Sequence, residues 1–578
     1  MFRSLAVSLS ICIALILGTQ ASGQQFADTI VYGDIITMEP GFPRVEAMAI
    51  KGDTIVALGT RDAVRKLAGD ETQTVVVPAE QCVIPGLIEG HGHFLGLGAS
   101  LMMLRLAEAA TWDDIVNQVE EAAKVTPPGE WILGRGWHQS KWKDTPQPNV
   151  EGYPYGTELD RVAPNNPVLL THASGHMSLA NGYAMQLAGV DEQTQPPDGG
   201  EILHAPDGKP IGIFRETSQA LISRALARDE AQKTSQQRLD SQLRAIQLAG
   251  AECLKNGITS FQDAGTSVQD IRLLRSLAEQ GKLPVRLWIM VRDSNDVLQQ
   301  ALPKIKAIGA GDEYFSCRAI KHSIDGALGP HGAWLLAPYN DLASSSGLNT
   351  TPLEVIERSA ELAIQNDFQL CVHAIGDRAN RETLDIFETA LGQVPNGNIR
   401  RWRVEHAQHL SVDDIPRFAS LGVIASMQGV HCTSDAIFVL QRLGNLRARE
   451  GAYVWRSLID SGAIVSNGTD APVENVNPFP SLAASMFRTL SDGETFFPEQ
   501  CMTREEALQS YTIHAAYAAF EESRKGSLVA GKLADFVVLD RDILTCEPAE
   551  VATTKVLKTF LGGKLVYEQT PEDAMSND

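Results

Sequence analysis

Short apolar runs recur along the middle of the chain, and each of them ends in a polar or glycine-rich turn. Most are followed by a stretch in which apolar residues recur at helical spacing, as at 352–366 and 413–422. Strands that alternate with helices favour a parallel sheet, and eight such units favour a closed, TIM-like (β/α)8 barrel of the α/β class. A doubly wound open sheet is the alternative. The eight runs lie at 82–94, 257–265, 284–291, 317–326, 368–377, 401–408, 422–428 and 463–472.

The two ends of the chain have a different pattern. Residues 26–81 and 525–568 consist of short alternating strands that are punctuated by glycine. Neither piece is large enough to bury a core alone, so we expect the two to pair as one small β-sandwich built from both chain ends. We place this composite domain at 24–81 and 515–570, around a barrel domain at 82–514.

A long insertion separates the first apolar run from the second, at about 112–215. It contains aromatic and polar segments such as WILGRGWHQSKW at 131–142. Insertions of this length in a barrel usually lie over the face that carries the active site, so we expect this one to shape substrate choice. Within it, Trp137 is a candidate for a substrate contact.

The first 23 residues have the pattern of a secretory signal peptide. Arg3 precedes an apolar stretch from Leu5 to Leu17, and small residues follow at 21–23. The apolar stretch is short for a membrane span, which needs about 20 residues. We therefore expect an exported, periplasmic or secreted chain that begins near Gln24 and has no membrane span. An uncleaved signal anchor is the alternative.

The composition is that of an ordinary globular protein, with 44% hydrophobic and 21% charged residues. Lys and Arg number 49 against 71 Asp and Glu, which gives a net charge of −22. An acidic surface argues against nucleic-acid and anionic-lipid partners and leaves a small molecule as the expected partner. The oligomeric state is open, with a homodimer among the alternatives. Apart from Cys12, the seven cysteines form no CxxC pair, so most are expected to be buried thiols, although a disulfide is not excluded.

Polar residues that can bind a metal close several of the apolar runs. His91 and His93 end the first run, and His373, His406 and Asp470 end the fifth, sixth and eighth. Residues i and i+2 of a strand face the same side, and the carboxyl ends of barrel strands meet at one edge. Imidazole and carboxylate ligands suit Zn²⁺ or another borderline divalent cation. For any one of these histidines taken alone, an ordinary buried side chain is the alternative.

Lys321 lies in the otherwise apolar fourth run. A buried ammonium group is costly unless it is paired or neutralised, and cations nearby would repel it. Reaction with CO2 would convert the amine into an anionic carbamate that can bridge two metals. The alternative is an ordinary lysine paired with Asp325. The carbamate reading predicts a two-metal centre, and the alternative predicts one metal.

Several longer segments resemble the amidohydrolase superfamily, in particular its YtcJ-like branch (amidohydrolase family 3), which includes N-substituted formamide deformylases. The matching segments include PGLIEGHGHF, KHSIDGALG, VHAIGDRAN, NGTDAPVENVNP and GSLVAGKLADFVVLD. The resemblance covers about 26–568. It implies that His91 and His93 hold a first metal with Asp470, that His373 and His406 hold a second, and that carboxylated Lys321 bridges them. It also places His176, in SGHMSLAN, near the substrate.

The sequence departs from this branch at four positions around the expected pocket. Gly429 stands where the branch usually has proline, and His331 where it usually has a basic residue. Ser174 replaces an aspartate and Thr469 a serine. These differences bear on the substrate and leave the expected ligand set complete.

The resemblance implies a metal-dependent amidohydrolase that cleaves a non-peptide, amide-type C–N bond with a metal-activated hydroxide. Asp470 would serve as general base and then as general acid. His431 and Arg447, which follow the seventh run, are further candidates for substrate contacts. The alternatives are an esterase, a deaminase or a lyase on the same scaffold, or a metal-bearing binding protein without activity. Deaminases of this superfamily carry a glutamate just after the sixth-strand histidine, and VEHAQH has none there.

Overall fold

The computed structural model describes residues 26–570 except 107, 140–141, 173–176 and 198–199. Eight parallel strands form a nearly closed barrel and follow one another around it in chain order. This order confirms the predicted barrel and excludes a doubly wound sheet, in which the order would reverse. The strands are β6 (Leu87–Gly92), β15 (Ile258–Thr266), β16 (Arg286–Val291), β18 (Phe315–Ser323), β19 (Gln369–Ala374), β20 (Arg403–His406), β21 (Ile424–Gln428) and β22 (Val465–Gly468).

The barrel closes where its first and last strands meet. Just beyond β22, the amide of Asp470 donates to the carbonyl of His91 over 2.8 Å. The amide of His93 donates in turn to the carbonyl of Ala471 over 2.7 Å. The buried carboxylate of Glu89 on β6 adds side-chain support, because it accepts from both the amide and the hydroxyl of Thr469. The closure therefore brings the carboxyl ends of these two strands together. We call the edge formed by the carboxyl ends of all eight strands the barrel mouth.

Helices pack around the outside of the barrel and follow the predicted periodicity. α11 buries Ile356, Ala360 and Ala363, which lie on one face at helical spacing. Its bounds and those of α13 confirm the helices expected at 352–366 and 413–422. The main helices are α7 (Ser235–Lys255), α8 (Val268–Glu279), α9 (Asn295–Ile305), α11 (Leu353–Asn366), α12 (Asp377–Gly392), α13 (Ile415–Leu421), α15 (Ala436–Leu443), α16 (Asn445–Gly451), α17 (Trp455–Asp460), α18 (Pro478–Phe487), α19 (Arg504–Ser510) and α20 (Ile513–Ala518).

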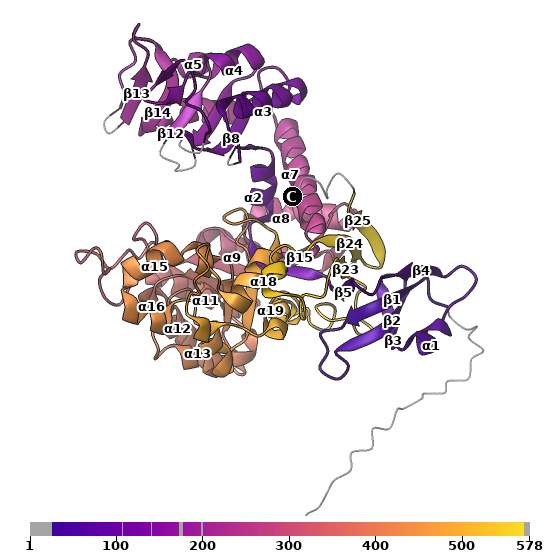
Figure 1. The fold of residues 1–578 in the computed structure, drawn as a ribbon. Coiled ribbons are helices and arrows are strands. Elements are labelled where there is room, and N and C mark those ends of the chain that lie inside the picture. Colours follow the sequence, from indigo (N-terminus) through magenta and orange to yellow (C-terminus); the bar gives the residue numbers. More distant parts are fainter. Residues whose placement is uncertain (1–25, 107, 140–141, 173–176, 198–199, 571–578) are drawn as a thin grey trace, which may run out of the picture.

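The two ends of the chain share one sheet beside the barrel (Figure 1). Its strand order is β25-β24-β23-β5-β1-β2-β3, with β4 paired to β1. Val31 and Val83 from one end pack in one core with Phe536 and Phe560 from the other. The strands are β1 (Thr29–Ile36), β2 (Arg44–Lys51), β3 (Thr54–Gly59), β4 (Gln73–Val76), β5 (Cys82–Pro85), β23 (Phe536–Leu539), β24 (Val556–Leu561) and β25 (Lys564–Glu568).

The first predicted run, 82–94, divides between two sheets. β5 pairs with β1 and β23 in the sheet of the chain ends, whereas β6 pairs with β15 in the barrel. The chain passes from one to the other at Gly86, where a side chain would meet the hydroxyl of Thr259 at 2.2 Å. One continuous apolar run therefore supplies a strand to each of the two sheets, and Gly86 lies where the chain passes between them.

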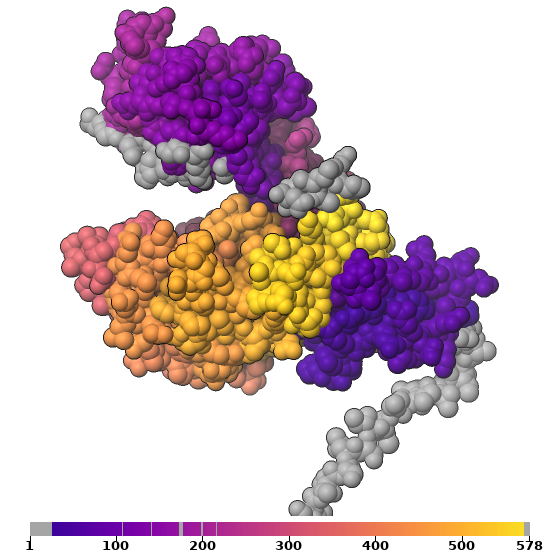
Figure 2. Space-filling view, viewed as in Figure 1, coloured from indigo at the N-terminus to yellow at the C-terminus, as the bar shows by residue number. Residues whose placement is uncertain are grey.

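The insertion forms a separate lobe with its own sheet, of order β13-β14-β12-β11-β8-β7 (Figure 1). It extends from β7 to α6 and so runs beyond the expected 112–215 at both ends. α2 leaves the barrel mouth directly after His93 and packs against α7, and these two helices join the lobe to the barrel. Figure 2 shows open space between the lobe and the barrel. The elements are α2 (Phe94–Leu101), β7 (Leu104–Arg105), α3 (Trp112–Val125), β8 (Ile132–Trp137), α4 (Thr157–Val162), β11 (Val168–His172), β12 (Met177–Ala180), α5 (Gly182–Ala188), β13 (Gly200–His204), β14 (Pro210–Glu216) and α6 (Gln219–Gln232).

Two further expectations concern the described residues as a whole. All seven cysteines between 26 and 570 are free thiols, and five of them are buried, as expected for packing residues. Within the same part of the chain, every helix is too short or too polar to cross a membrane. The expected signal peptide at 1–23 lies outside the described residues.

Candidate metal centre

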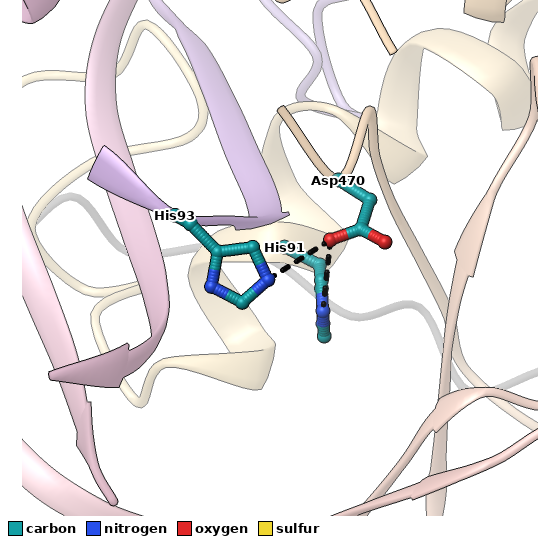
Figure 3. Close-up of side chains that lie close together, drawn as sticks. All are labelled: His91, His93 and Asp470. Atoms are coloured by element: carbon teal, nitrogen blue, oxygen red, sulfur yellow. Dashed lines mark ion pairs between the residues drawn. The ribbon is translucent and has the colours of Figure 1, made fainter. Parts of the chain in front are cut away.

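Three side chains gather where the barrel closes. His91 lies on β6, His93 follows that strand and Asp470 follows β22 (Figure 3). The Oδ1 atom of Asp470 lies 3.2 Å from Nε2 of His93 and 3.6 Å from Nε2 of His91. One ligand atom from each residue lies within 4.8 Å of the other two, a spacing that allows the three to hold one metal ion. The backbone hydrogen bonds of the closure fix this spacing.

The electrostatics of His91 and Asp470 favour the protonation states that metal ligands need. Burial, with a contribution from Lys321, lowers the pKa of His91 to about 4, so its imidazole is neutral near pH 7. Burial would raise the pKa of Asp470, but the hydrogen bond from His93 and the charges of neighbouring imidazoles outweigh it. They hold that pKa well below its usual range. A neutral imidazole and an ionised carboxylate bind a cation without first losing a proton.

The other three expected ligands lie beside this group. The ring centroids of His406 and His91 are 4.7 Å apart, and those of His406 and His373 are 4.4 Å apart. Nζ of Lys321 lies 3.4 Å from Nε2 of His91. Burial lowers the pKa of Lys321, and it lowers the pKa of His373 to about 3. The structure therefore brings all six side chains to the barrel mouth.

Lys321 is not paired with Asp325, which was the alternative partner. Instead, Asp325 accepts backbone N–H bonds from Trp334, Ile375 and Gly376 at 2.8–3.0 Å. Its Oδ1 atom also lies 3.5 Å from Nε2 of His373. Burial raises the pKa of Asp325 to about 7. The carboxylate thus holds the loops that follow β18 and β19, and the amine of Lys321 contacts the expected ligand His91 instead.

Side chains that the sequence analysis did not identify orient the imidazoles. His91 Nδ1 hydrogen-bonds the carboxylate of Glu405, which is also paired with Arg403 over 2.7 Å. His406 Nδ1 lies 2.7 Å from Oε1 of Gln428. Such contacts fix the ring orientation and would direct Nε2 toward a cation bound by these residues. The sequence did contain a signal for the pair of Arg403 and Glu405, because two opposite charges stand at positions i and i+2 of a buried strand.

The four expected substrate contacts have different positions. His431 is buried near the ligands, with its ring nearly parallel to that of His406 and 6.4 Å from it. Arg447 instead donates to the carbonyls of Leu443, Ala337 and Pro338 and so holds a loop.

Trp137 lies in the core of the insertion, only 1% exposed, where it stacks on Trp142 and donates to the carbonyl of Leu170. The structure gives it a packing position in the lobe and no place among the metal ligands. His176 and Ser174 lie outside the described residues. His431 is therefore the only one of the four that the described residues place beside the ligands.

Known proteins resemble this chain over nearly its whole length. A family model described as "Amidohydrolase family" matches residues 79–567. "Protein LONG AFTER FAR-RED 3" of Arabidopsis thaliana is 30% identical over 94% of this chain and 92% of its own length. "Putative amidohydrolase YtcJ" of Bacillus subtilis (strain 168) is 29% identical over 93% of this chain and 99% of its own. "N-substituted formamide deformylase" of Arthrobacter pascens is 28% identical over 94% of this chain and 98% of its own length.

The same fold occurs in a solved structure of an uncharacterized metal-dependent hydrolase from Pyrococcus furiosus. Its TM-score is 0.71 at 24% sequence identity, and the match covers 89% of this chain and 100% of that one.

Proposed function

Because this chain belongs to the amidohydrolase family, and is thus a metal-dependent hydrolase, we propose that it cleaves the amide-type C–N bond of a small, non-peptide substrate. The observation that carries the proposal is the gathering of six metal-binding side chains at one end of the barrel. Barrel enzymes carry their chemistry at that end. The family supports the class of reaction, and the described geometry supports the position of the centre.

We assign the first cation to His91, His93 and Asp470, whose ligand atoms lie within 4.8 Å of one another. The second is assigned to His373 and His406, with zinc as the metal in both positions. The donor set suits this ion, because zinc is a borderline cation that binds both imidazole nitrogen and carboxylate oxygen. The buried Nε2 of His373 makes no hydrogen bond with any described residue, although the Asp325 carboxylate lies 3.5 Å away, and a cation would use its lone pair.

Lys321 is assigned the bridging position as a carbamate. The residue is 3% exposed, and the one hydrogen-bond contact of its amine with the described residues is with His91. An unprotonated amine is the form that reacts with CO2, and burial favours this form. The resulting anion would offset part of the charge of two cations.

The residues of the chain then have separate tasks. When bound, the cations act as Lewis acids and lower the pKa of a coordinated water. Asp470 takes a proton from the attacking water and passes it to the leaving nitrogen. Glu405 and Gln428 hold the rings of His91 and His406 in place. His431 lies close enough to the ligands to contact the substrate.

A substrate screen with metal analysis tests this function. The purified protein, loaded with zinc, is assayed against N-acyl amino acids, N-formyl amines, hydantoins and simple esters. We expect hydrolysis of at least one amide and bound zinc, and we expect His93→Ala to lose metal and activity together because it removes a ligand. A protein that binds zinc but cleaves only esters would contradict the proposed bond. A His93→Ala variant with full metal content and activity would place the site elsewhere.

We also propose that the protein is exported and that its first 23 residues are removed. The pattern of a short apolar stretch after Arg3 supports this. Fractionation of the producing cells, with N-terminal sequencing of the recovered protein, should find a periplasmic or secreted chain that begins near Gln24. A recovered chain that still begins at Met1 would contradict it.

A further inference from the structure

Arg292 is an exposed cation at the barrel mouth that has no carboxylate partner among the described residues. It follows the last residue of β16. Its one side-chain hydrogen bond is a long one, from Nη2 to the hydroxyl of Ser323 over 3.5 Å. Ser323 ends β18, two residues after Lys321. The guanidinium therefore lies over the strand end that carries the proposed bridging lysine.

The neighbouring strand end holds the stem of this side chain. The amide of Arg292 donates to the carbonyl of Thr266 over 2.9 Å. A side chain at Gly265, whose φ is +147°, would meet Cδ of Arg292 at 3.3 Å. The aliphatic part of the Arg292 side chain thus lies against the backbone of Gly265 at the end of β15, while its guanidinium reaches Ser323 at the end of β18. This anchoring limits how far the charge can swing away from the mouth.

Strand register places the guanidinium of Arg292 beside the proposed ligands. Ser323, which the guanidinium contacts, lies opposite His373 where β18 pairs with β19. The guanidinium therefore lies next to the end of a strand that carries a proposed ligand.

Two arginines in helices that follow barrel strands already have partners. Arg378 pairs with Glu382 over 3.4 Å and lies over the ring of Trp334. Arg442 pairs with Asp341 and also donates to the carbonyl of Gly329. Unlike these two, Arg292 has no carboxylate partner among the described residues, and it lies at the barrel mouth.

We propose that Arg292 binds a carboxylate of the substrate and so makes the enzyme selective for N-acyl amino acids over uncharged amides. This inference rests on the proposed function. A guanidinium presents paired N–H donors that match the two oxygens of a carboxylate. Arg292 is a residue that determines specificity, and it takes no part in bond cleavage.

The test compares two substrates that differ only in the carboxylate. These are N-acetylphenylalanine, supplied as both enantiomers, and N-acetylphenethylamine, and the enzymes are zinc-loaded wild type, Arg292→Met and Arg292→Lys. In Arg292→Met we expect kcat/KM for the acid to fall about 10- to 100-fold, mainly through KM, because a charged hydrogen-bonded pair is lost. The value for the uncharged amide should stay within about twofold, and Arg292→Lys should recover part of the loss.

Two controls separate this role from a structural one. Arg358→Met removes an equal charge from the exposed face of α11, where the side chain pairs with Glu361, and should leave the substrate preference unchanged. Raising the salt concentration should weaken wild-type kcat/KM for the acid and leave the amide unaffected, because salt screens charge pairs. Zinc content should be equal in all variants.

The outcomes distinguish the two proposals. If wild type hydrolyses neither substrate nor any other amide of the screen, the proposed function fails. If wild type hydrolyses amides but shows no preference for the acid, or if Arg292→Met keeps that preference, this inference is wrong and the proposed function stands.

Discussion

At the residue scale, the proposed centre contains ligands in an unfavourable backbone conformation. His406 and Asp470 have φ values of 75° and 58°, in the left-handed region that side-chain-bearing residues seldom adopt. Such a conformation costs about 1–3 kcal/mol per residue and persists only where the surroundings enforce it. Here the closure of the barrel enforces it for Asp470, whose amide is bonded to the carbonyl of His91. This strained geometry supports a site built for function.

Removal of Lys321 tests whether the centre holds one metal or two. Lys321→Ala deletes the proposed carbamate, so we expect activity near zero and loss of about half the bound zinc. Added short carboxylic acids should restore part of the activity, because they can take the place of the bridge. Lys306→Ala, which removes a surface lysine that pairs with Asp367, serves as control. A Lys321→Ala variant that stays active with a single bound metal would leave a mononuclear hydrolase.

Gln428 offers a test of how the second metal is held. Its Oε1 lies 2.7 Å from Nδ1 of His406, so Gln428→Leu leaves that ring without an acceptor. Loss of such a supporting contact typically lowers metal affinity about 10- to 100-fold. Gln428→Glu keeps an acceptor oxygen and should retain the affinity. Zinc affinity is measured by competition with a chelator. Equal affinity in wild type and Gln428→Leu would show that His406 does not depend on this contact.

At the element scale, two strands far apart in sequence bring the proposed first-metal ligands together. β6 and β22 meet through backbone hydrogen bonds at the level of His91, His93 and Asp470. Glu89 adds a buried contact to Thr469, the residue that stands where the YtcJ-like branch usually has serine. Both residue types supply the hydroxyl that this contact needs. The departure at Thr469 therefore preserves the closure.

Substitution of Thr469 tests this closure. Thr469→Val keeps the volume but removes the hydroxyl that donates to Glu89 over 2.9 Å. A buried carboxylate that loses a donor costs about 1–3 kcal/mol, so we expect the free energy of unfolding in urea to fall by that amount. Thr469→Ser should unfold as wild type does. An unchanged denaturation midpoint for Thr469→Val would mean that the backbone bonds alone close the barrel.

Sequence patterns predicted the barrel strands and the six proposed ligands, because histidine or aspartate closes four of the apolar runs and Lys321 interrupts the apolar pattern of a fifth. The same patterns could not show which buried charges meet. Glu405 and His91 come from strands far apart in the chain, and only the closed barrel brings them together. The lobe boundaries were also too narrow, because the two-residue strand β7 and the helix α6 resemble connecting segments. Trp137 was expected at the substrate but is buried in the lobe. Its sequence context could not show this, because an aromatic residue in an insertion has the same neighbours in sequence whether it is buried or exposed.

At the scale of the whole molecule, buried histidines make stability depend on pH. Burial, with a smaller contribution from Arg447, lowers the pKa of His409 to about 3. Neither ring nitrogen of this residue has a hydrogen-bond partner among the described residues. In the unfolded chain a histidine binds a proton below about pH 6.5, whereas folded His409 remains neutral. The unfolded state therefore binds more protons between these values, and stability must fall as the pH is lowered through that window.

His409→Leu should reduce this acid sensitivity. The loss of stability attributable to one such residue is up to about 1.4 kcal/mol per pH unit well below pH 6.5. We expect the variant to lose less unfolding free energy than wild type between pH 6.5 and about pH 5, in urea titrations of the metal-free protein. His204→Gln, at a half-exposed position of the insertion, is the control. Equal pH profiles for His409→Leu and wild type would contradict the buried neutral state of His409.

The most direct test of the whole account is a titration of metal-free protein with zinc while amide hydrolysis is measured. The proposed centre predicts no hydrolysis without metal and a rate that rises to a plateau at about two equivalents. His91→Ala, which lacks a ligand of the first cation, should not reach that plateau at any zinc concentration. Full hydrolysis by metal-free protein, or a response to zinc that His91→Ala shares with wild type, would contradict a metal-dependent centre at the barrel mouth.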